Sequence, residues 1–228
     1  MIPDGSIDGR LRREYFELLP EMGRAKHHVE ARVLNLLLPI RDTLQPYERI
    51  VIKHRLKECE SAIDSLRRRE EGGTFNRKQP QRYSLRDLPD LVGIRIMLFP
   101  PNLIERVNAS VRAHFEDWRT DPIYESDGTI LFAYKYDGYC QQGHRIRTEV
   151  QVMSLLTGLF SEVEHDALYK PDPRYKGVAK SLKMQASSWF VLNALRQFEN
   201  TFENLITSGG TIKNAIEEMA DEIVEKLE

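Results

Sequence analysis

The fold of this chain is decided by a nearly continuous apolar run, Leu91-Val92-Gly93-Ile94-Arg95-Ile96-Met97-Leu98-Phe99. An apolar run of this length, rich in β-branched residues, is typical of a strand buried on both faces at the centre of a sheet. Pro100-Pro101 follows directly and ends the strand, because proline cannot donate to the hydrogen-bond ladder. We therefore take residues 91–99 as the central strand.

Three other segments carry strand patterns. Residues 48–55 alternate between apolar and polar side chains, and residues 129–136 are rich in β-forming residues. Residues 145–153 alternate more strictly, so that their polar side chains share one face and their apolar side chains the other. Asp137-Gly138 stands between the last two segments and predicts a turn. Together these segments predict a small sheet around residues 91–99.

Helical periodicity accounts for most of the remaining chain. The expected helices cover residues 10–38, with a break at Pro20, and residues 57–71, 102–116, 154–169, 178–207 and 211–227. Pro39 and Pro46 are expected to end the first helical region, and Gly209-Gly210 separates the last two helices. Residues 74–86 are polar and basic and predict a loop. The sequence thus predicts an α+β fold, a small sheet flanked by helices at both chain ends.

Composition excludes several classes of protein. The 228 residues are 41% hydrophobic and 30% charged, which is ordinary for a soluble globular protein. The formal net charge of -2 gives no global basic field for nucleic acid. Two cysteines without metal-ligand spacing indicate a reducing compartment and no zinc site. The first residues lack the apolar segment of a signal peptide, and no apolar run is long enough to cross a membrane, so we expect a cytoplasmic protein.

Two carboxylates form the sharpest candidate site. Asp90 stands just before the central strand, and Glu149 lies on the polar face of residues 145–153. If these strands are neighbours, both carboxylates project into one cleft, where they can hold Mg²⁺ or take a proton from a hydroxyl. The alternative is structural: an Asp at a strand end and a Glu on a solvated face are both common.

A second candidate cluster is basic. Arg55 and Lys57 flank the start of an expected helix, and Ser61 lies one turn after Lys57 on the same helix face. Such a group can bind a triphosphate, and an arginine can also stack on a base. The alternative is a solvated, generally charged helix. The sequence contains neither a P-loop nor a GxGxxG fingerprint, so a nucleotide site here must use carboxylates and scattered cations.

Four segments, in order, resemble the synthetase domain of RelA/SpoT-type alarmone synthetases. They are Arg55-Leu56-Lys57-Glu58-Cys59-Glu60-Ser61, Asp87-Leu88-Pro89-Asp90-Leu91-Val92-Gly93-Ile94-Arg95-Ile96, Glu149-Val150-Gln151-Val152 and Ser161-Glu162-Val163-Glu164-His165-Asp166-Ala167-Leu168-Tyr169-Lys170. Each match is short, but their order and spacing follow the family over roughly residues 50–200.

This resemblance implies a nucleotidyltransferase-like fold with a mixed sheet, ATP as pyrophosphate donor and Mg²⁺ as cofactor. It implies that Asp90 binds the metal and that Glu149 binds metal or activates the acceptor hydroxyl. It implies that ATP is contacted by Arg55, Lys57, Ser61 and Arg95, and that Gln151 supports the acceptor side of the site. The implied activity is transfer of the β,γ-pyrophosphate of ATP to the 3′-hydroxyl of GDP or GTP.

The acceptor pocket leaves two placements open. The family carries K-x-N-G-Y before its second carboxylate strand, and Lys135-Tyr136-Asp137-Gly138-Tyr139 matches it, with His144 nearby. Under this placement Lys135, Tyr139 and His144 bind the acceptor, but little chain remains for the family's strand. The other placement puts a turn at Asp127-Gly128 and keeps the strand, with Thr129 in place of the family's tyrosine.

Other departures keep the substrate open. Met153-Ser154 stands where the family has R-T, so that Arg145 and Arg147 are the substitutes for its arginine. The alternatives are the same chemistry on tRNA or an adenine nucleotide, for which the loop cations Arg77, Lys78, Arg82 and Arg86 are the hint, or a non-catalytic nucleotide-binding module. A homo-oligomer or a neutralising partner on the terminal helices is also compatible with the sequence. The expected domains are a helical region at 1–46, the synthetase-like domain at 47–207 and a C-terminal helix at 208–228.

Overall fold

The computed structural model describes residues 7–71, 83–124, 131–140, 146–164 and 182–225. The chain forms two compact units. The first comprises Met1–Met97 and Ile104–Met153, and the second comprises Leu98–Leu103 and Ser154–Glu228. Each unit is described by itself.

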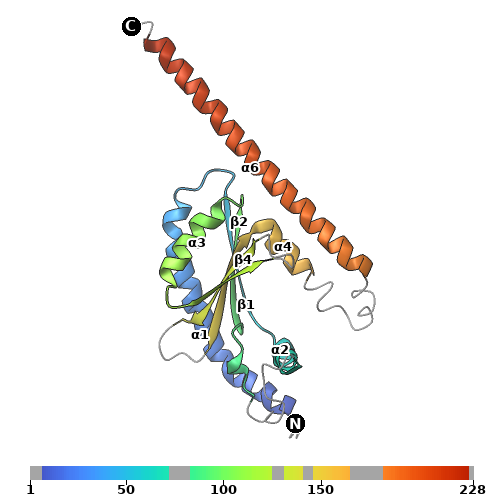
Figure 1. Ribbon diagram of the computed structural model, residues 1–228. Helices are drawn as coiled ribbons and strands as arrows, with labels where there is room; N and C mark the ends of the chain where they lie inside the picture. The colour runs from blue at the N-terminus through green and yellow to red at the C-terminus, as the bar shows by residue number, and fades with distance from the viewer. Residues whose placement is uncertain (1–6, 72–82, 125–130, 141–145, 165–181, 226–228) are drawn as a thin grey trace. The chain divides into compact units, whose positions relative to one another are not determined.

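A five-stranded sheet with the order β1-β2-β5-β4-β3 organises the first unit (Figure 1). Its strands are β1 (Arg49–Leu56), β2 (Val92–Phe99), β3 (Arg119–Tyr124), β4 (Leu131–Tyr139) and β5 (Arg147–Ser154). The apolar run found in the sequence is β2, and it lies between β1 and β5 as a central strand should. β4 pairs antiparallel with both β3 and β5.

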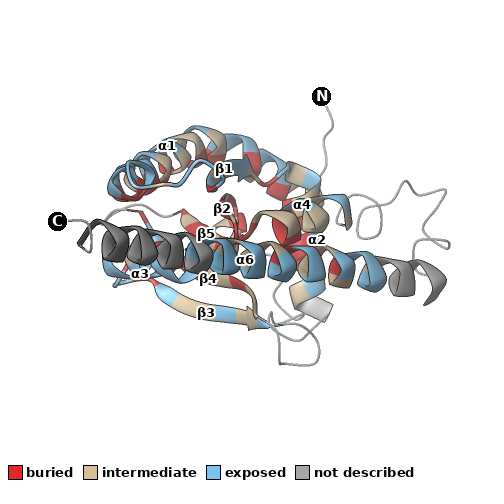
Figure 2. Ribbon diagram, turned by 90° about the horizontal axis from the view of Figure 1, so that it is seen from above, coloured by how far each residue is buried: buried red, intermediate tan, exposed pale blue. Residues whose placement is uncertain are grey.

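Helices α1 (Ile7–Arg41) and α3 (Leu103–His114) pack on one face of this sheet. The Tyr136 hydroxyl of β4 donates to the Asn108 side chain of α3, and the Cys140 thiol donates to the Ala25 carbonyl of α1. Residues 136 and 140 have the same strand parity, so both helices lie on the same side. Figure 2 shows the buried residues of α1 as a stripe along the helix beside β1.

The buried positions of α3 follow the sequence prediction. Leu103, Val107, Val111 and Phe115 are all buried at the expected spacing. The alternating segment of β5 is also confirmed, because Thr148, Val150 and Val152 are fully buried against the helices. The remaining elements of this unit are α2 (Cys59–Glu71) and the short 3-10 helix η2 (Leu85–Asp87).

The turn predicted at Asp137-Gly138 is wrong. Both residues lie within β4 and pair with Glu149 and Thr148 of β5. The glycine has a packing role instead: a Cβ at Gly138 would lie 2.5 Å from Cγ of Trp118, whose indole nitrogen donates to the Tyr139 carbonyl at 3.1 Å. Gly138 thus makes room for a tryptophan against the strand, and β4 continues through the expected turn.

Two other predictions about elements are corrected, and one strand has no counterpart in the sequence predictions. α1 runs through both Pro20 and Pro39, because its buried stripe, including Leu18 and Met22, continues past Pro20 and packing outweighs the lost backbone hydrogen bond. α2 begins at Cys59 rather than at residue 57. β3 was not predicted, since its sequence Arg-Thr-Asp-Pro-Ile-Tyr is largely polar and contains a proline, as an edge strand permits.

The second unit contains α4 (Leu155–Glu164) and α6 (Leu182–Glu225). α6 continues through Gly209-Gly210, where the sequence predicted an interruption. The buried Glu199 of α6 accepts from the Leu156 amide at 3.3 Å, and Phe202 packs on Phe99 with ring centroids 4.8 Å apart. None of the helices in the described ranges has the length and apolar character needed to cross a bilayer. The domain boundaries at 46/47 and 207/208 remain a prediction.

Candidate active site

The face of the sheet opposite α1 and α3 carries the polar residues singled out in the sequence. The register of β4 and β5 pairs Lys135 with Gln151, Asp137 with Glu149, and Tyr139 with Arg147. Because side chains alternate along a strand, these six residues share one face. The predicted cluster around Glu149 is therefore brought together by the pairing of β4 with β5.

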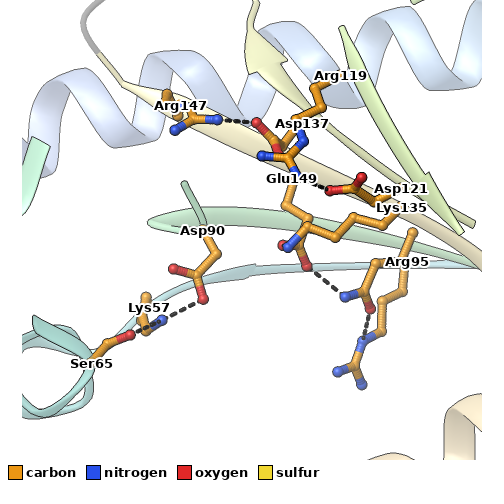
Figure 3. A network of polar contacts seen from close by, with 11 residues as sticks. Lys57, Ser65, Asp90, Arg95, Arg119, Asp121, Lys135, Asp137, Arg147 and Glu149 are labelled. Atoms are coloured by element: carbon orange, nitrogen blue, oxygen red, sulfur yellow. Dashed lines mark hydrogen bonds and ion pairs between the residues drawn. The ribbon is translucent and has the colours of Figure 1, made fainter. Parts of the chain in front are cut away.

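Glu149 lies at the centre of a polar network on this face (Figure 3). The Lys135 ammonium forms an ion pair with one carboxylate oxygen, and the Gln151 amide donates to the other. Gln151 in turn accepts from Nε of Arg95 on β2 at 3.0 Å. Glu149 is only 7% exposed, which contradicts the alternative of a solvated surface glutamate. A buried carboxylate held at both oxygens has a fixed orientation.

A second ion pair lies where β1 leads into α2. The ammonium of Lys57 contacts Oδ2 of Asp90, just before β2, and donates to Ser65 Oγ at 3.3 Å (Figure 3). Lys57 is 9% exposed. Its backbone is held on both sides: its amide donates to the Leu91 carbonyl at 2.9 Å, and its carbonyl accepts from the Tyr15 hydroxyl at 2.9 Å.

The charges of this pair respond to burial and to each other. Burial lowers the pKa of Lys57, against the raising effect of Asp90. Burial would raise the pKa of Asp90, but the charge and hydrogen bond of Lys57, together with Arg69 and Arg55, outweigh it and lower the pKa. The carboxylate therefore stays ionised at neutral pH with cations around it.

The predicted placement of Lys57 and Ser61 on one helix face is wrong. Lys57 precedes α2, and its ammonium contacts Ser65, one turn further along the helix than Ser61. The sequence prediction failed because it began the helix two residues too early, at Lys57 itself. Serine at position 65 is the residue that sequence reasoning missed, and its helical spacing of four from Ser61 was the available signal.

Arg55 lies on the same face of the sheet as Arg95. A Cβ built on Gly93 would lie 3.5 Å from Cγ and 3.6 Å from Nε of Arg55, so the arginine passes over this glycine. Gly93 and Arg95 are two residues apart on β2 and face the same way. Arg55 itself is exposed. The face thus carries two guanidinium groups, those of Arg55 and Arg95.

The structure describes three of the predicted acceptor-side residues, and their role in binding an acceptor remains a prediction. Lys135 and Gln151 belong to the network, and Tyr139 lies on the same face, 48% exposed, opposite Arg147. His144 and Arg145 lie outside the described residues. β4 ends at Tyr139 and the next strand, β5, already carries Glu149, so the objection to the first placement stands, and β4 covers most of the strand that the second placement expects. Arg147, proposed as a substitute cation, is ion-paired with Asp137 on the same face.

The donor set around Asp90 fits a hard divalent cation. Oδ1 of Asp90 is buried and has no hydrogen-bond partner among the described residues, so its lone pairs are available to a ligand there. Among the described residues, no three His, Cys, Asp or Glu side chains are grouped to hold a metal. A Mg²⁺ ion here would therefore draw ligands from substrate phosphates and water, which is its usual habit. Sharing of one ion by Asp90 and Glu149 remains a prediction.

Comparison with solved structures identifies the fold. Small alarmone synthetase 1 from Bacillus subtilis superimposes with a TM-score of 0.61 at 16% identity, covering 85% of this chain and 96% of that one. A GTP pyrophosphokinase family protein from Streptococcus pneumoniae gives a TM-score of 0.61 at 16% identity, covering 84% and 92%. This chain has the fold of the small alarmone synthetases. The predicted α+β fold with a mixed sheet is thereby confirmed, and so is the resemblance to RelA/SpoT-type synthetases at the level of the fold.

The structural similarity has no counterpart in the sequence comparisons. No family model matches the chain, and no curated protein matches it either. The Bacillus subtilis enzyme is also known bound to AMPCPP, at a TM-score of 0.56 and 17% identity, and bound to its product pppGpp, at a TM-score of 0.58 and 16% identity. These matches cover 84% of this chain and 94% and 95% of the respective structures.

Proposed function

We propose that this protein is an ATP-dependent pyrophosphokinase that transfers the β,γ-pyrophosphate of ATP to the 3′-hydroxyl of GDP or GTP. One observation carries the proposal. The residues that resemble the synthetase motifs come from distant parts of the sequence, yet Arg95, Lys135, Glu149 and Gln151 form one contact network on the face that Arg55 also covers. The small alarmone synthetase fold supports the same conclusion.

We assign the binding of ATP, the pyrophosphate donor, to the connection between β1 and α2. Arg55 and Lys57 are cations suited to the phosphates or the base of ATP, and Arg95 lies on the neighbouring strand β2. Asp90 would hold Mg²⁺ through its free oxygen, and the ion would neutralise phosphate charge when bound. Ser61 remains a proposed contact from α2. Binding of AMPCPP by the Bacillus subtilis enzyme is consistent with ATP as donor.

We assign activation of the acceptor hydroxyl to Glu149. The 3′-oxygen attacks the β-phosphorus, the bond from that phosphorus to the α-phosphate oxygen breaks, and AMP leaves. Glu149 takes the proton of the attacking hydroxyl. Lys135 and Gln151 hold the carboxylate in place, so little reorganisation is needed when the acceptor arrives. Tyr139 and Gln151 are proposed to contact the acceptor.

The identity of the acceptor is the finer part of this proposal. The product pppGpp named for the Bacillus subtilis enzyme favours a guanine nucleotide. The tRNA alternative relied on loop cations, and the one of them that the structure describes, Arg86, lies 2.9 Å from Glu21 in an ion pair. A guanine nucleotide is therefore proposed first.

Incubation with γ-labelled ATP and a panel of acceptors tests the proposal. The panel is GDP, GTP, AMP, ADP, ATP and tRNA, and the readout is label on the acceptor together with AMP in equal amount. We expect label on GDP or GTP. Label only on tRNA or an adenine nucleotide would support pyrophosphate transfer but show that the acceptor is not a guanine nucleotide. ATP binding without transfer to any acceptor would favour a non-catalytic module.

The shared metal is tested separately. A crystal structure with Mn²⁺ and AMPCPP should show the ion bound by Asp90 and Glu149, located by its anomalous signal. An ion bound by Asp90 alone would leave Glu149 as the base only. Carboxylates too far apart to share an ion, with no element able to move between them, would contradict the two-carboxylate site.

A further inference from the structure

The ammonium of Lys57 lies against the carboxylate of Asp90, the group proposed to bind a metal ion. It contacts Oδ2 of the carboxylate, while Oδ1 of the same group is buried and has no partner in the part of the chain that the structure describes. A carboxylate has only two oxygens at close separation, so an ion on Oδ1 would lie within a few ångströms of the ammonium. The two cations would repel each other strongly in a site shielded from water.

Lys57 is held in this position by several independent contacts. Its backbone amide is bonded to Leu91 and its carbonyl to Tyr15, each at 2.9 Å. Its ammonium has a second acceptor in the buried Ser65. The backbone is thus fixed, whereas the ammonium is attached through a four-carbon stem that can rotate. Only the charged end of the side chain needs to move for the site to change.

We infer that Lys57 acts as a built-in substitute for the metal, excluding divalent cations from Asp90 until nucleotide phosphates draw its ammonium away. Metal and nucleotide would then enter together, and the protein without nucleotide would hold little metal. The inference rests on the proposed function for the nucleotide, because phosphates are the anions that compete with Asp90 for the ammonium. The exclusion itself depends only on Lys57 and Asp90.

The test measures Mn²⁺ binding without nucleotide, from the loss of the free-ion signal in electron paramagnetic resonance. Lys57→Met removes the charge and keeps the length of the side chain. We expect the variant to bind Mn²⁺ at least about tenfold more tightly than wild type, a low estimate for removing a like charge at contact distance. Lys57→Gln provides a second uncharged variant if the methionine variant does not fold, as judged by thermal melting.

Three matched variants make the result specific. Lys57→Arg retains the positive charge and should stay as weak as wild type. Lys53→Met, at an exposed position of β1, should do the same. Lys57→Met combined with Asp90→Asn should lose the gained affinity, because the binding oxygen is replaced by an amide.

Two results would overturn the inference: folded Lys57→Met and Lys57→Gln variants that bind Mn²⁺ no more tightly than wild type, or a gain that persists without Asp90. Failure of the proposed function would look different. If wild type transferred no pyrophosphate but Lys57→Met still bound Mn²⁺ more tightly than wild type, the proposed enzymatic activity would be contradicted. The proposed exclusion of metal by Lys57 would still hold.

Discussion

Two lysine–carboxylate pairs lie in the first unit, and they differ in what they leave unsatisfied. One oxygen of Asp90 contacts Lys57, and the other is buried with no partner from residues 7–71, 83–124, 131–140, 146–164 or 182–225. Glu149 has one oxygen on Lys135 and the other on Gln151, which is itself held by Arg95. The first carboxylate thus has an oxygen that no described protein group holds, whereas both oxygens of the second are held by protein groups. Asp90 therefore has the oxygen better suited to a cation, and Glu149 has the fixed orientation that a base needs.

The largest expected effect tests the Glu149 side of this comparison. Glu149→Gln should lower pyrophosphate transfer by roughly 10²–10⁴-fold, because an amide cannot take the proton of the acceptor hydroxyl. Transfer of label from γ-labelled ATP measures it, and thermal melting checks that the variant folds. Asp121→Asn, on the edge strand β3, is the matched control and should change little. Near-normal transfer by a folded Glu149→Gln protein would show that Glu149 is not the base.

The next effect concerns the Asp90 side. Arg55→Ala or Lys57→Ala should weaken ATP binding by about 1.5–3 kcal/mol, the usual contribution of a hydrogen bond to a charged group. Calorimetric titration of ATP without divalent cation into each variant gives the affinity, and Lys53→Ala on the same strand serves as the control. Unchanged affinity in both variants would show that Arg55 and Lys57 do not bind ATP and have a purely structural role.

A stability measurement tests the strand pairing that holds Lys135 opposite Gln151 and beside Glu149. Gly138→Ala places a methyl group 2.5 Å from the Trp118 ring, so the strand or the ring must shift. We expect a loss of about 1–3 kcal/mol in the free energy of unfolding, as for other overpacked sites. Urea denaturation measures it, with Gly23→Ala, which meets nothing within 4 Å, as the control. Equal stability of the two variants would contradict the described contact of Trp118 with β4.

The smallest effect is a pH dependence at Asp90. Burial raises its pKa, but Lys57 and nearby arginines outweigh burial, so that the folded pKa lies below the unfolded one. Such a group stabilises the fold above its unfolded pKa, about 3.9, and loses that contribution as the pH falls through the folded pKa. The free energy of unfolding should therefore decline more steeply below about pH 4 in wild type than in Asp90→Asn. Parallel curves from urea denaturation between pH 3 and 7 would contradict this.

The sequence predicted the elements whose patterns are strong. The apolar run of β2, the alternation of β5 and the four-residue stripe of α3 are each set by burial, which leaves a direct periodic trace. The four ordered motif segments were likewise sufficient for the fold. These features are local, so one sequence contains enough information to find them.

What the sequence did not predict depends on tertiary contacts. Asp137-Gly138 is a good turn signal in isolation, and only the packing of Trp118 shows why the strand continues. Pro20 is a helix breaker until the buried stripe of α1 outweighs it. The pairs Lys57–Asp90 and Lys135–Glu149 join residues 33 and 14 positions apart, and their pairing follows from strand order and register rather than from spacing. The carboxylates and both lysines were predicted individually, but their ion pairs were not.

The contact between Trp118 and Gly138 also means that the fluorescence of Trp118 can report changes at the end of β4. The sequence contains two tryptophans, and Trp118 is buried against β4 with its indole nitrogen bonded to the Tyr139 carbonyl. In a Trp189→Phe protein, all tryptophan emission would come from this single ring. Any ligand that shifts the end of β4 at Tyr139 would change the surroundings of the indole and so its emission wavelength. Acceptor binding would then be observable in real time, without label and before any chemistry takes place.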